Sequence, residues 1–387
     1  MNRGGAGERR LELGPNAGLI GKPRSRDALA TPALVLDLDA LEHNLDVMAR
    51  FCKQAGMNLR PHVKTHKSIE IAKRQIERGA AGVCVATLRE ATVMVEAGVP
   101  GVLLTSPIVG AAKIEALCAL LGRCGDLMIV ADDLDQLAAL EAAVASTGKT
   151  LPVLVDVDIG MRRTGVPDIA GVLALIRRLD DSQALEFAGL QAYGRVAGVA
   201  RGADRARAYA RELAHLRAVR DAVTRAGYTP RIVSGGGTGT FDLDARAGLL
   251  TECQCGSYAL MDVEYVQAQS LTRALRPFKI ALFVQCTVVS RRHRGSATID
   301  AGSKCLSQDG PAPRPARGAP PGATYRFCGD ELGSIRLARQ RDALKLGSKV
   351  ELAVAHCDRT VNLHDYFHCV RGEVLTAISP VDARGSL

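Results

Sequence analysis

The sequence contains no tryptophan, and aromatic residues of all kinds make up only 4% of its 387 residues. The hydrophobic core must therefore be built from Ala, Val, Leu and Ile, which are typical of buried parallel strands and their covering helices. No apolar run approaches the roughly 20 residues that a membrane-spanning helix needs, so no membrane partner is expected. The Gly- and Arg-rich residues 1–30 lack the apolar core of a secretion signal. We therefore expect a cytoplasmic protein with a peripheral N-terminal tail.

A one-sided basic surface is missing as well. The formal charge of +9 comes from 50 Lys and Arg against 41 Asp and Glu, and the arginines at 201–220 share an Ala-rich helical stretch with acidic residues. A nucleic-acid surface needs cations on one face or interleaved with stacking aromatics. No nucleic-acid partner is expected, and the charge favours attraction for small anions.

The cysteines do not form a recognisable disulfide framework. Their number, 11, is odd, and most lie inside apolar runs, as reduced and buried thiols of a cytosolic protein do. Cys253 and Cys255 form a Cys-x-Cys pair, but no second pair follows at the spacing of a zinc ribbon. We interpret both as strand residues.

The chain does contain a regular alternation of short apolar runs and amphipathic stretches between residue 31 and about residue 262. Each run is long enough for one strand, and most gaps fit one helix with two turns. The runs are Leu59–Lys64, Gly82–Thr87, Val102–Ser106, Leu127–Ala131, Leu151–Asp158, Phe187–Tyr193, Arg231–Ser234 and Cys253–Tyr258. Eight strand–helix units predict an α/β fold of the (β/α)8 barrel type, with a doubly wound open sheet as the competing fold.

Helical periodicity fades beyond about Leu271. Runs such as Ile280–Val289 and Val350–Ala353 are separated by loops, which predicts a second, mostly antiparallel β domain. The expected organisation is a tail at 1–30, a barrel at 31–271 and a β domain at 272–387. The segment before Leu36 is a candidate to join the β domain.

The first predicted strand ends in a cluster of titratable side chains. The run contains Arg60, His62, Lys64, His66 and Lys67. In barrels of this type the chemistry lies at the C-terminal ends of the strands. A lysine held near other cations and partly desolvated has a lowered pKa, which suits an amine nucleophile, so Lys64 is a candidate. A solvated basic loop is the alternative.

The last two predicted strands end in turns that suit phosphate. The candidate residues there are Ser234, Gly236, Gly237, Thr238, Gly256, Ser257 and Tyr258. Glycines let the backbone approach an anion closely, and neighbouring N–H and hydroxyl groups donate to phosphate oxygens. Phosphate sites in these barrels commonly follow strands seven and eight. An activated lysine with two such turns points to pyridoxal 5′-phosphate held as a Schiff base, although tight turns without a ligand remain the alternative.

Further polar residues follow the fifth and sixth strands. Arg163 lies in the Asp156–Gly165 segment, and an Arg directed at the pyridine nitrogen would discourage its protonation. Gln191 and Tyr193 are candidates to line the cofactor ring. Loop residues that cap the next helix are the alternative for each.

His356 and Asp358 form a possible metal pair in the second domain. If Val350 to His356 is a strand, the two residues face one side, with Cα atoms roughly 6.6 Å apart. Imidazole and carboxylate suit Zn²⁺, Mn²⁺ or Mg²⁺, and water would complete an open shell. A turn with a capping Asp is the alternative.

At these residues the chain resembles a known family, the metal-activated fold-type III pyridoxal-phosphate enzymes that include D-threonine aldolase, D-3-hydroxyaspartate aldolase and D-serine dehydratase. The matching motifs extend over nearly the whole chain and include Arg-Pro-His-x-Lys-Thr-His-Lys, Gly-Leu-Gln-Ala-Tyr, Gly-Gly-Gly-Thr-Gly, Gly-Ser-Tyr-Ala-x-Met-Asp and His-Cys-Asp-x-Thr-x-Asn-Leu-His-Asp. The resemblance implies that Lys64 is the Schiff-base lysine, that Arg163 lies near the ring and that the glycine turns hold the phosphate. It also implies that His356 and Asp358 bind the metal, and that the protein is a homodimer in which the second domain of one subunit closes the site of the other.

The sequence departs from the family pattern at three places. Residues 194–199 contain none of the histidines that aldolases of this type carry after the Gln-Ala-Tyr motif. Leu332 stands where the family has His in Asp-Glu-His-Gly, and Asp382 stands where it has Ser in Ser-Ala-Arg-Gly. The first two changes remove imidazoles from near the expected active site and leave the cofactor assignment unchanged.

The resemblance implies cleavage of a small D-β-hydroxy-α-amino acid to glycine and an aldehyde. The metal lowers the pKa of the β-hydroxyl, a metal-bound hydroxide takes its proton in place of the missing His, and Lys64 or water reprotonates the α-carbon. The dehydratase branch usually shows His-x-Cys at the metal pair, so Asp358 favours an aldolase. The alternatives are a D-serine or D-3-hydroxyaspartate dehydratase, a racemase and a non-catalytic pyridoxal-phosphate carrier. A racemase has no use for the metal pair, and carriers resemble the barrel alone.

Overall fold

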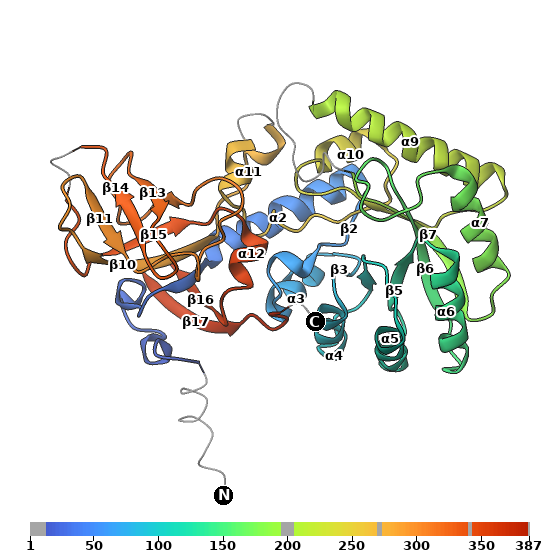
Figure 1. Cartoon of the computed structure of the whole chain (residues 1–387), viewed down its shortest axis with the longest axis horizontal. Helices are drawn as coiled ribbons and strands as arrows, with labels where there is room; N and C mark the ends of the chain where they lie inside the picture. The colour runs from blue at the N-terminus through green and yellow to red at the C-terminus, as the bar shows by residue number, and fades with distance from the viewer. Residues whose placement is uncertain (1–12, 195–204, 269–272, 340–342, 386–387) are drawn as a thin grey trace, which may run out of the picture. The chain divides into compact units, whose positions relative to one another are not determined.

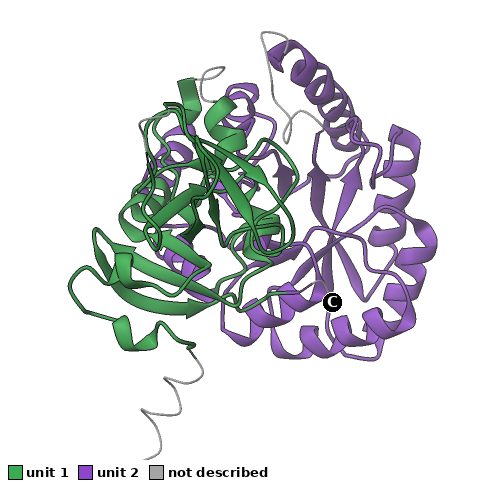
Figure 2. Cartoon of the chain, turned by 60° about the vertical axis from the view of Figure 1, so that its left-hand side comes forward, with its two compact units in different colours: residues 1–45, 65–68, 257–384 green, residues 46–64, 69–256, 385–387 purple. Residues whose placement is uncertain are grey.

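The computed structural model describes residues 13–194, 205–268, 273–339 and 343–385 (Figure 1). By its internal contacts the chain divides into two compact units, which Figure 2 shows in different colours. We call residues 46–64, 69–256 and 385–387 the barrel unit, and residues 1–45, 65–68 and 257–384 the sheet unit.

Eight parallel strands form the sheet of the barrel unit. They are β2 (Asn58–Leu59), β3 (Val83–Val85), β4 (Val102–Leu104), β5 (Met128–Ala131), β6 (Leu151–Val157), β7 (Leu185–Ala192), β8 (Ile232–Gly235) and β9 (Glu252–Cys253). Neighbours pair in the order β2-β9-β8-β7-β6-β5-β4-β3. Each of the eight predicted runs contains part of one of these strands, but Cys255 lies outside β9, so the prediction that it is a strand residue is wrong.

The two ends of this sheet meet and close it into a barrel. The backbone N–H of Ala81 donates to Leu59 O at 2.8 Å, and that of Cys84 donates to Pro61 O at 2.9 Å. A parallel bridge between His62 and Cys84 continues the contact. The (β/α)8 barrel is therefore the correct fold, and the doubly wound open sheet is excluded.

Helices alternate with the strands of the barrel unit. They are α3 (Ile69–Glu77), α4 (Leu88–Glu96), α5 (Ala111–Arg123), α6 (Leu134–Ala145), α7 (Ile169–Asp180), α9 (Arg205–Arg225) and α10 (Phe241–Ala247). The helix α2 (Leu38–Ala55) precedes β2, and its residues 46–55 belong to this unit. Local sequence fixes several helix starts, since Thr87, Asp133 and Asp168 each accept a hydrogen bond from a backbone N–H of the first turn.

The barrel core is aliphatic, as the scarcity of aromatic residues predicts. One cluster inside the barrel consists of Cys84, Leu103, Met128, Val130, Leu154 and Ala188. All 11 cysteines are free thiols in the structure.

The sheet unit contains a mostly antiparallel sheet of nine strands. They are β1 (Ala33–Asp37), β10 (Leu282–Ser290), β11 (Ser296–Ile299), β12 (Arg314–Pro315), β13 (Thr324–Phe327), β14 (Gly333–Arg336), β15 (Lys349–Ala353), β16 (Tyr366–Arg371) and β17 (Val374–Pro380). The main path is β13-β14-β11-β10-β1-β16-β17, while β15 pairs with β10 and β12. Only the β1–β16 pair is parallel among the described pairs of this sheet.

Short helices connect the elements of the sheet unit. They are α11 (Val263–Ala268) and α12 (Cys357–Val361), with the 3-10 turns η1 (Ala17–Leu19), η2 (Ser25–Ala28) and η4 (Arg273–Leu275). A further 3-10 turn, η3 (Val63–Thr65), follows β2. Among the described helices, none is both long enough and apolar enough to cross a membrane.

The limits of the two units differ from the predicted domain limits at residues 31 and 272. The strand β1 pairs with β10 and with β16, so residues 33–37 belong to the sheet unit. Residues 257–268 also belong to the sheet unit, where the backbone N–H of Val263 donates to Val354 O at 3.0 Å. The segment before Leu36 thus joins the sheet unit, as the sequence suggests, whereas the pairing that places residues 257–268 there leaves no compositional mark in the sequence. The limits 1–30, 31–271 and 272–387 stay a prediction about parts that fold independently.

Candidate active site

Lys64 lies in η3, directly after the first barrel strand, and is half-buried. Its backbone N–H donates to His62 Nδ1 at 3.4 Å. The other ring nitrogen, Nε2, lies 3.1 Å from Thr105 Oγ1, and that hydroxyl donates its own proton to Val85 O. Nε2 therefore carries the ring proton and Nδ1 accepts. His62 thus holds the backbone of the lysine turn.

The basic cluster around Lys64 is smaller than the sequence predicts. Arg60 points to the opposite end of the barrel, where its Nε lies 2.7 Å from Glu252 Oε1 and both side chains are buried. A Cβ atom on Gly82 would lie 2.2 Å from the guanidinium, so the glycine makes room for it just before β3. The prediction that Arg60 crowds Lys64 is wrong, because a carboxylate on the last barrel strand pairs with it.

A network of buried polar side chains crosses the barrel from β6 to β9. Gln191 Nε2 donates to Asp156 Oδ1 at 3.1 Å, and Thr164 Oγ1 donates to Asp156 Oδ2 at 2.8 Å. Gln254 Nε2 donates to Gln191 Oε1 at 3.1 Å and to Ser234 Oγ at 2.9 Å. Burial raises the pKa of Asp156, although the hydrogen bonds from Gln191 and Thr164 oppose the rise. The network fixes the side chains of two predicted cofactor residues, Gln191 and Ser234.

Arg163 and Tyr193 meet at the end of the neighbouring strands β6 and β7. The guanidinium carbon of Arg163 lies 5.7 Å from the centroid of the Tyr193 ring, within the range of a cation–π contact. The structure therefore brings together two of the side chains that the sequence assigns to the cofactor ring. Residues 195–199, where the family histidines are missing, lie outside the described residues.

The glycine turn after β8 has a left-handed backbone at Gly236, with φ of 67°. A Cβ atom there would lie 2.3 Å from Asp244 Oδ2, so this position requires glycine. The Gly237 N–H donates to Thr240 Oγ1 at 3.2 Å, and Thr240 Oγ1 donates to Asp244 Oδ2 at 2.9 Å. Thr238, also in this turn, is buried.

Asp244 is the buried carboxyl group to which the glycine turn is connected through Thr240. Its Oδ1 accepts the hydroxyl of Tyr209 at 2.5 Å. Burial raises the pKa of Asp244 to about 7, against the effect of the two hydrogen bonds. A carboxyl group that holds a proton in this range adds less negative charge beside the glycine turn than an ionised one does.

The second predicted turn is divided between the two units. Gly256 belongs to the barrel unit, whereas Ser257 and Tyr258 belong to the sheet unit. Ser257 O accepts the backbone N–H of Met261 at 2.7 Å. Tyr258 is 1% exposed, and its ring packs edge-on against Phe278 with centroids 6.1 Å apart.

His356 and Asp358 lie close together in the sheet unit. The strand β15 ends at Ala353, so the predicted strand to His356 is wrong: His356 caps the short helix α12, and Asp358 lies in its first turn. The pair still converges, with His356 Nε2 3.9 Å from Asp358 Oδ1. Asp358 Oδ1 is buried without a hydrogen-bond partner, as an oxygen that binds a cation would be.

Two further carboxylates support this pair. Asp309 Oδ2 lies 2.7 Å from His356 Nδ1, and Asp262 accepts the backbone N–H groups of Cys357 and Tyr265, each at 3.1 Å. Burial raises the pKa of Asp262 to about 6. Burial lowers the pKa of His356, but the surrounding carboxylates outweigh it and the net pKa is raised. Among the described residues, no group of three or more His, Cys, Asp or Glu is arranged to hold a metal ion.

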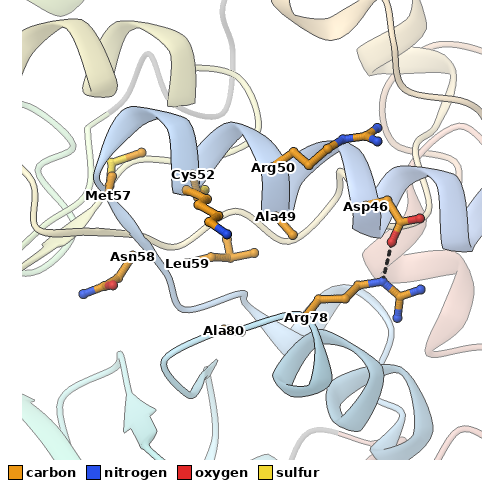
Figure 3. Close-up of a pocket in the computed structure, with 11 residues that line it drawn as sticks. Asp46, Ala49, Arg50, Cys52, Met57, Asn58, Leu59, Arg78 and Ala80 are labelled. Carbon is orange, nitrogen blue, oxygen red and sulfur yellow. Dashed lines mark hydrogen bonds and ion pairs between the residues drawn. The ribbon is translucent and has the colours of Figure 1, made fainter.

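A pocket of about 550 Å³ lies in the barrel unit at the end where the strands begin, opposite the end that carries Lys64 (Figure 3). Its lining includes the last turns of α2 and residues 78–80, immediately before β3. Arg78 Nε donates to Asp46 Oδ1 at 2.7 Å across it. None of the predicted site residues lines this pocket. Residues at this end of a barrel serve stability rather than chemistry.

A (β/α)8 barrel with a lysine after its first strand, in one chain with an antiparallel sheet, defines the alanine-racemase-like class of fold-type III proteins. Residues 36–263 match the family described as alanine racemase, N-terminal domain, and residues 281–370 match the putative serine dehydratase domain. The chain belongs to the alanine racemase N-terminal domain family.

Relatives of similar length support a narrower grouping. The chain is 38% identical to the D-threonine aldolase of Arthrobacter sp. over 94% of its length and 95% of the relative's. It is 34% identical to the 3-hydroxy-D-aspartate aldolase of Paracoccus denitrificans over 92% of each. The crystal structure of D-threonine aldolase from Filomicrobium marinum superposes with a TM-score of 0.87, at 38% identity over 92% of this chain and 95% of that one. The protein is thus an enzyme of the lyase class, within a group of aldolases and dehydratases, and this membership supports pyridoxal 5′-phosphate as its cofactor.

Proposed function

We propose that the protein cleaves a D-β-hydroxy-α-amino acid of the D-threonine type to glycine and an aldehyde, with pyridoxal 5′-phosphate and a divalent metal ion. The observation that carries the proposal is the pair of His356 Nε2 and Asp358 Oδ1, 3.9 Å apart with the carboxylate oxygen buried and unpartnered. A metal beside the substrate hydroxyl is what aldol cleavage needs. The aldolase names of the two relatives support the same reaction.

The barrel residues fit the cofactor. Lys64 offers a half-buried amine at the C-terminal end of the strands, Arg163 and Tyr193 offer a cation and a ring, and the turn at Gly236 leaves no room for a side chain. When bound, pyridoxal 5′-phosphate takes up the electron pair released when a bond to the substrate α-carbon breaks. We assign phosphate binding to Ser234, Gly236, Gly237, Thr238, Gly256, Ser257 and Tyr258, and contacts with the ring to His62, Arg163, Gln191 and Tyr193.

Lys64 performs two tasks in this proposal. Its Nζ is the amine that would hold the cofactor aldehyde in the resting enzyme, and it would return a proton to the substrate α-carbon after cleavage. His62 supports both tasks by holding the lysine backbone. The amide of Gln191 donates to Asp156 and to Thr105 O and accepts from Gln254, so it contributes shape rather than a free donor.

The proposed role of the metal pair concerns the hydroxyl group on the β-carbon of the substrate. We assign His356 Nε2 and Asp358 as ligands of Mn²⁺, Zn²⁺ or Mg²⁺, with water completing the shell. These two residues would hold a divalent ion, which would supply Lewis-acid chemistry by lowering the pKa of a bound hydroxyl, as Zn²⁺ lowers that of water to about 7. Loss of the β-hydroxyl proton is the event that starts aldol cleavage.

A dehydratase is the second candidate, because residues 281–370 match the putative serine dehydratase domain. In that reaction Lys64 removes the α-proton and the β-hydroxyl leaves as water, giving ammonia and a keto acid. Product analysis separates the two. The holoenzyme is incubated with D-threonine, D-phenylserine, D-3-hydroxyaspartate and D-serine, and glycine and ammonia are quantified. We expect glycine from at least one of the first three; ammonia without glycine would establish the dehydratase.

We also propose a homodimer in the cytoplasm. Light scattering of the purified protein at micromolar concentration is expected to give twice the chain mass of 41.0 kDa. A monomer that retains full turnover would contradict the proposed dimer.

A further inference from the structure

Asp309 contacts His356, one of the two proposed metal ligands, at the ring nitrogen Nδ1. Its Oδ2 lies 2.7 Å from His356 Nδ1. An ionised carboxylate can only accept, so Nδ1 carries the ring proton. The lone pair of a neutral His356 ring is then on Nε2, the atom that lies 3.9 Å from Asp358 Oδ1.

Asp309 is itself held by the helix that carries the pair. The hydroxyl of Ser307 donates to Asp309 Oδ1, and the Ser307 backbone N–H donates to Thr360 Oγ1 at 3.3 Å. Arg359 Nε lies 3.2 Å from Asp309 Oδ2. Thr360 and Arg359 both belong to α12, so residues 307–309 are attached to the helix on whose N-terminal end His356 and Asp358 lie.

We propose that Asp309 is a positioning residue for the metal ion, which it serves by fixing the tautomer and the ring orientation of His356. The inference rests on the metal site of the proposed function. A carboxylate that accepts from the remote N–H of a ligating histidine raises its basicity, and loss of such a partner typically weakens metal affinity 10- to 100-fold.

A purely structural role predicts a different outcome. The side chains of Asp309 and His356 are 27% and 29% exposed, and ion pairs with this access to solvent add little to stability. Loss of Asp309 is therefore expected to weaken metal binding strongly and to change the unfolding temperature of the metal-free protein little.

The test is a calorimetric titration of Mn²⁺ into metal-stripped, cofactor-loaded enzyme. Wild type is compared with Asp309→Asn, Asp309→Ala and Glu373→Gln, the last being an exposed acid of the sheet unit that pairs with Arg317. We expect Kd to rise about 10- to 100-fold in Asp309→Ala. The rise is expected to be smaller in Asp309→Asn, whose amide oxygen still accepts from Nδ1–H, and absent in Glu373→Gln.

The possible outcomes separate this inference from the proposed function. Tight Mn²⁺ binding by wild type and equally tight binding by Asp309→Ala would overturn the role of Asp309 and leave the metal site standing. An equal loss of Mn²⁺ affinity in Glu373→Gln would also overturn the role of Asp309, because the removal of any negative charge would then explain the result. Wild type without measurable Mn²⁺ binding would contradict the metal site and this inference together. A metal-free Asp309→Asn with an unchanged melting temperature and weaker Mn²⁺ binding supports it.

Discussion

At the scale of single residues, the proposal depends most on Lys64. Its turn is held by His62, which in turn is fixed by Thr105, so the amine starts from a backbone that is held in place. Replacement of Lys64 by Ala is expected to abolish covalent attachment of pyridoxal 5′-phosphate and to lower turnover at least 1,000-fold, on the order of the loss seen for other catalytic nucleophiles. The measurement is the mass of the protein after borohydride reduction. The matched control is Lys73→Ala, which changes an exposed lysine of α3. This variant is expected to keep both the covalent attachment of the cofactor and the turnover.

The identity of single residues also limits what the sequence predicts. Lys64, His356 and Asp358 stand out because they occur in recognisable motifs. Gln254 and Asp309 carry no such signal, since a lone Gln in an apolar run and a lone Asp in a loop are common. Their roles follow only from contacts with Gln191 and His356, which are distant in the sequence.

At the scale of the elements, the glycine turn after β8 and the helices α9 and α10 are connected through one titrating carboxyl group, that of Asp244. The carboxyl of Asp244 (α10) lies between Tyr209 and Thr240, and Arg205 and Asp242 are its charged neighbours. Its pKa of about 7 lies above the ordinary value of 3.8, so the folded state keeps a proton that the unfolded state releases. The free energy of unfolding therefore falls as pH rises from about 4 to about 7, by up to ~1.4 kcal/mol per pH unit, and this contribution is constant above that range.

Asp244→Asn is expected to reduce the fall of the unfolding free energy with rising pH. The measurement is urea unfolding of the cofactor-free protein at several pH values between 4 and 8. The control is Asp181→Asn, an exposed residue after α7, which is expected to leave the slope as in wild type. An unchanged slope in Asp244→Asn would show that this carboxyl is ionised throughout the range.

The barrel strands depend on a second buried assembly, the ion pair of Arg60 and Glu252. Their side chains are 6% and 3% exposed, and the pair joins β2 to β9. Glu252→Gln leaves a buried guanidinium without its counter-charge and is expected to cost about 3–5 kcal/mol in unfolding free energy. The double variant Arg60→Met/Glu252→Gln is expected to be more stable than Glu252→Gln alone in the same urea assay, since it removes the unpaired charge. A mild effect of the single variant would mean that water solvates this end of the barrel.

At the scale of the whole molecule, the sequence predicts the architecture well. All eight barrel strands are visible as apolar runs because both faces of a parallel strand are buried. The sequence suggests that the segment before Leu36 joins the β domain, but not its partners, because the pairing of β1 with β10 and β16 joins residues about 250 and 330 positions away. His356 and Asp358, which the sequence predicts as a metal pair, do lie close together, although the strand geometry predicted for them is wrong.

Metal removal tests the molecule as a whole. A chelator is expected to abolish turnover while the covalently attached cofactor remains, because the pair His356 and Asp358 lies in the sheet unit and Lys64 in the barrel unit. Turnover is expected to return with Mn²⁺, as measured by an aldehyde assay. Activity that is indifferent to the chelator would exclude the pair from the reaction.

The most direct test of the central claim is quantification of glycine released by the metal-loaded, cofactor-loaded enzyme from D-threonine and from L-threonine. The account predicts glycine and acetaldehyde in equal amounts from the D-isomer, none from the L-isomer, and none from the D-isomer with Lys64→Ala or Asp358→Ala. Release of ammonia in place of glycine, or equal glycine from Asp358→Ala and wild type, would contradict it.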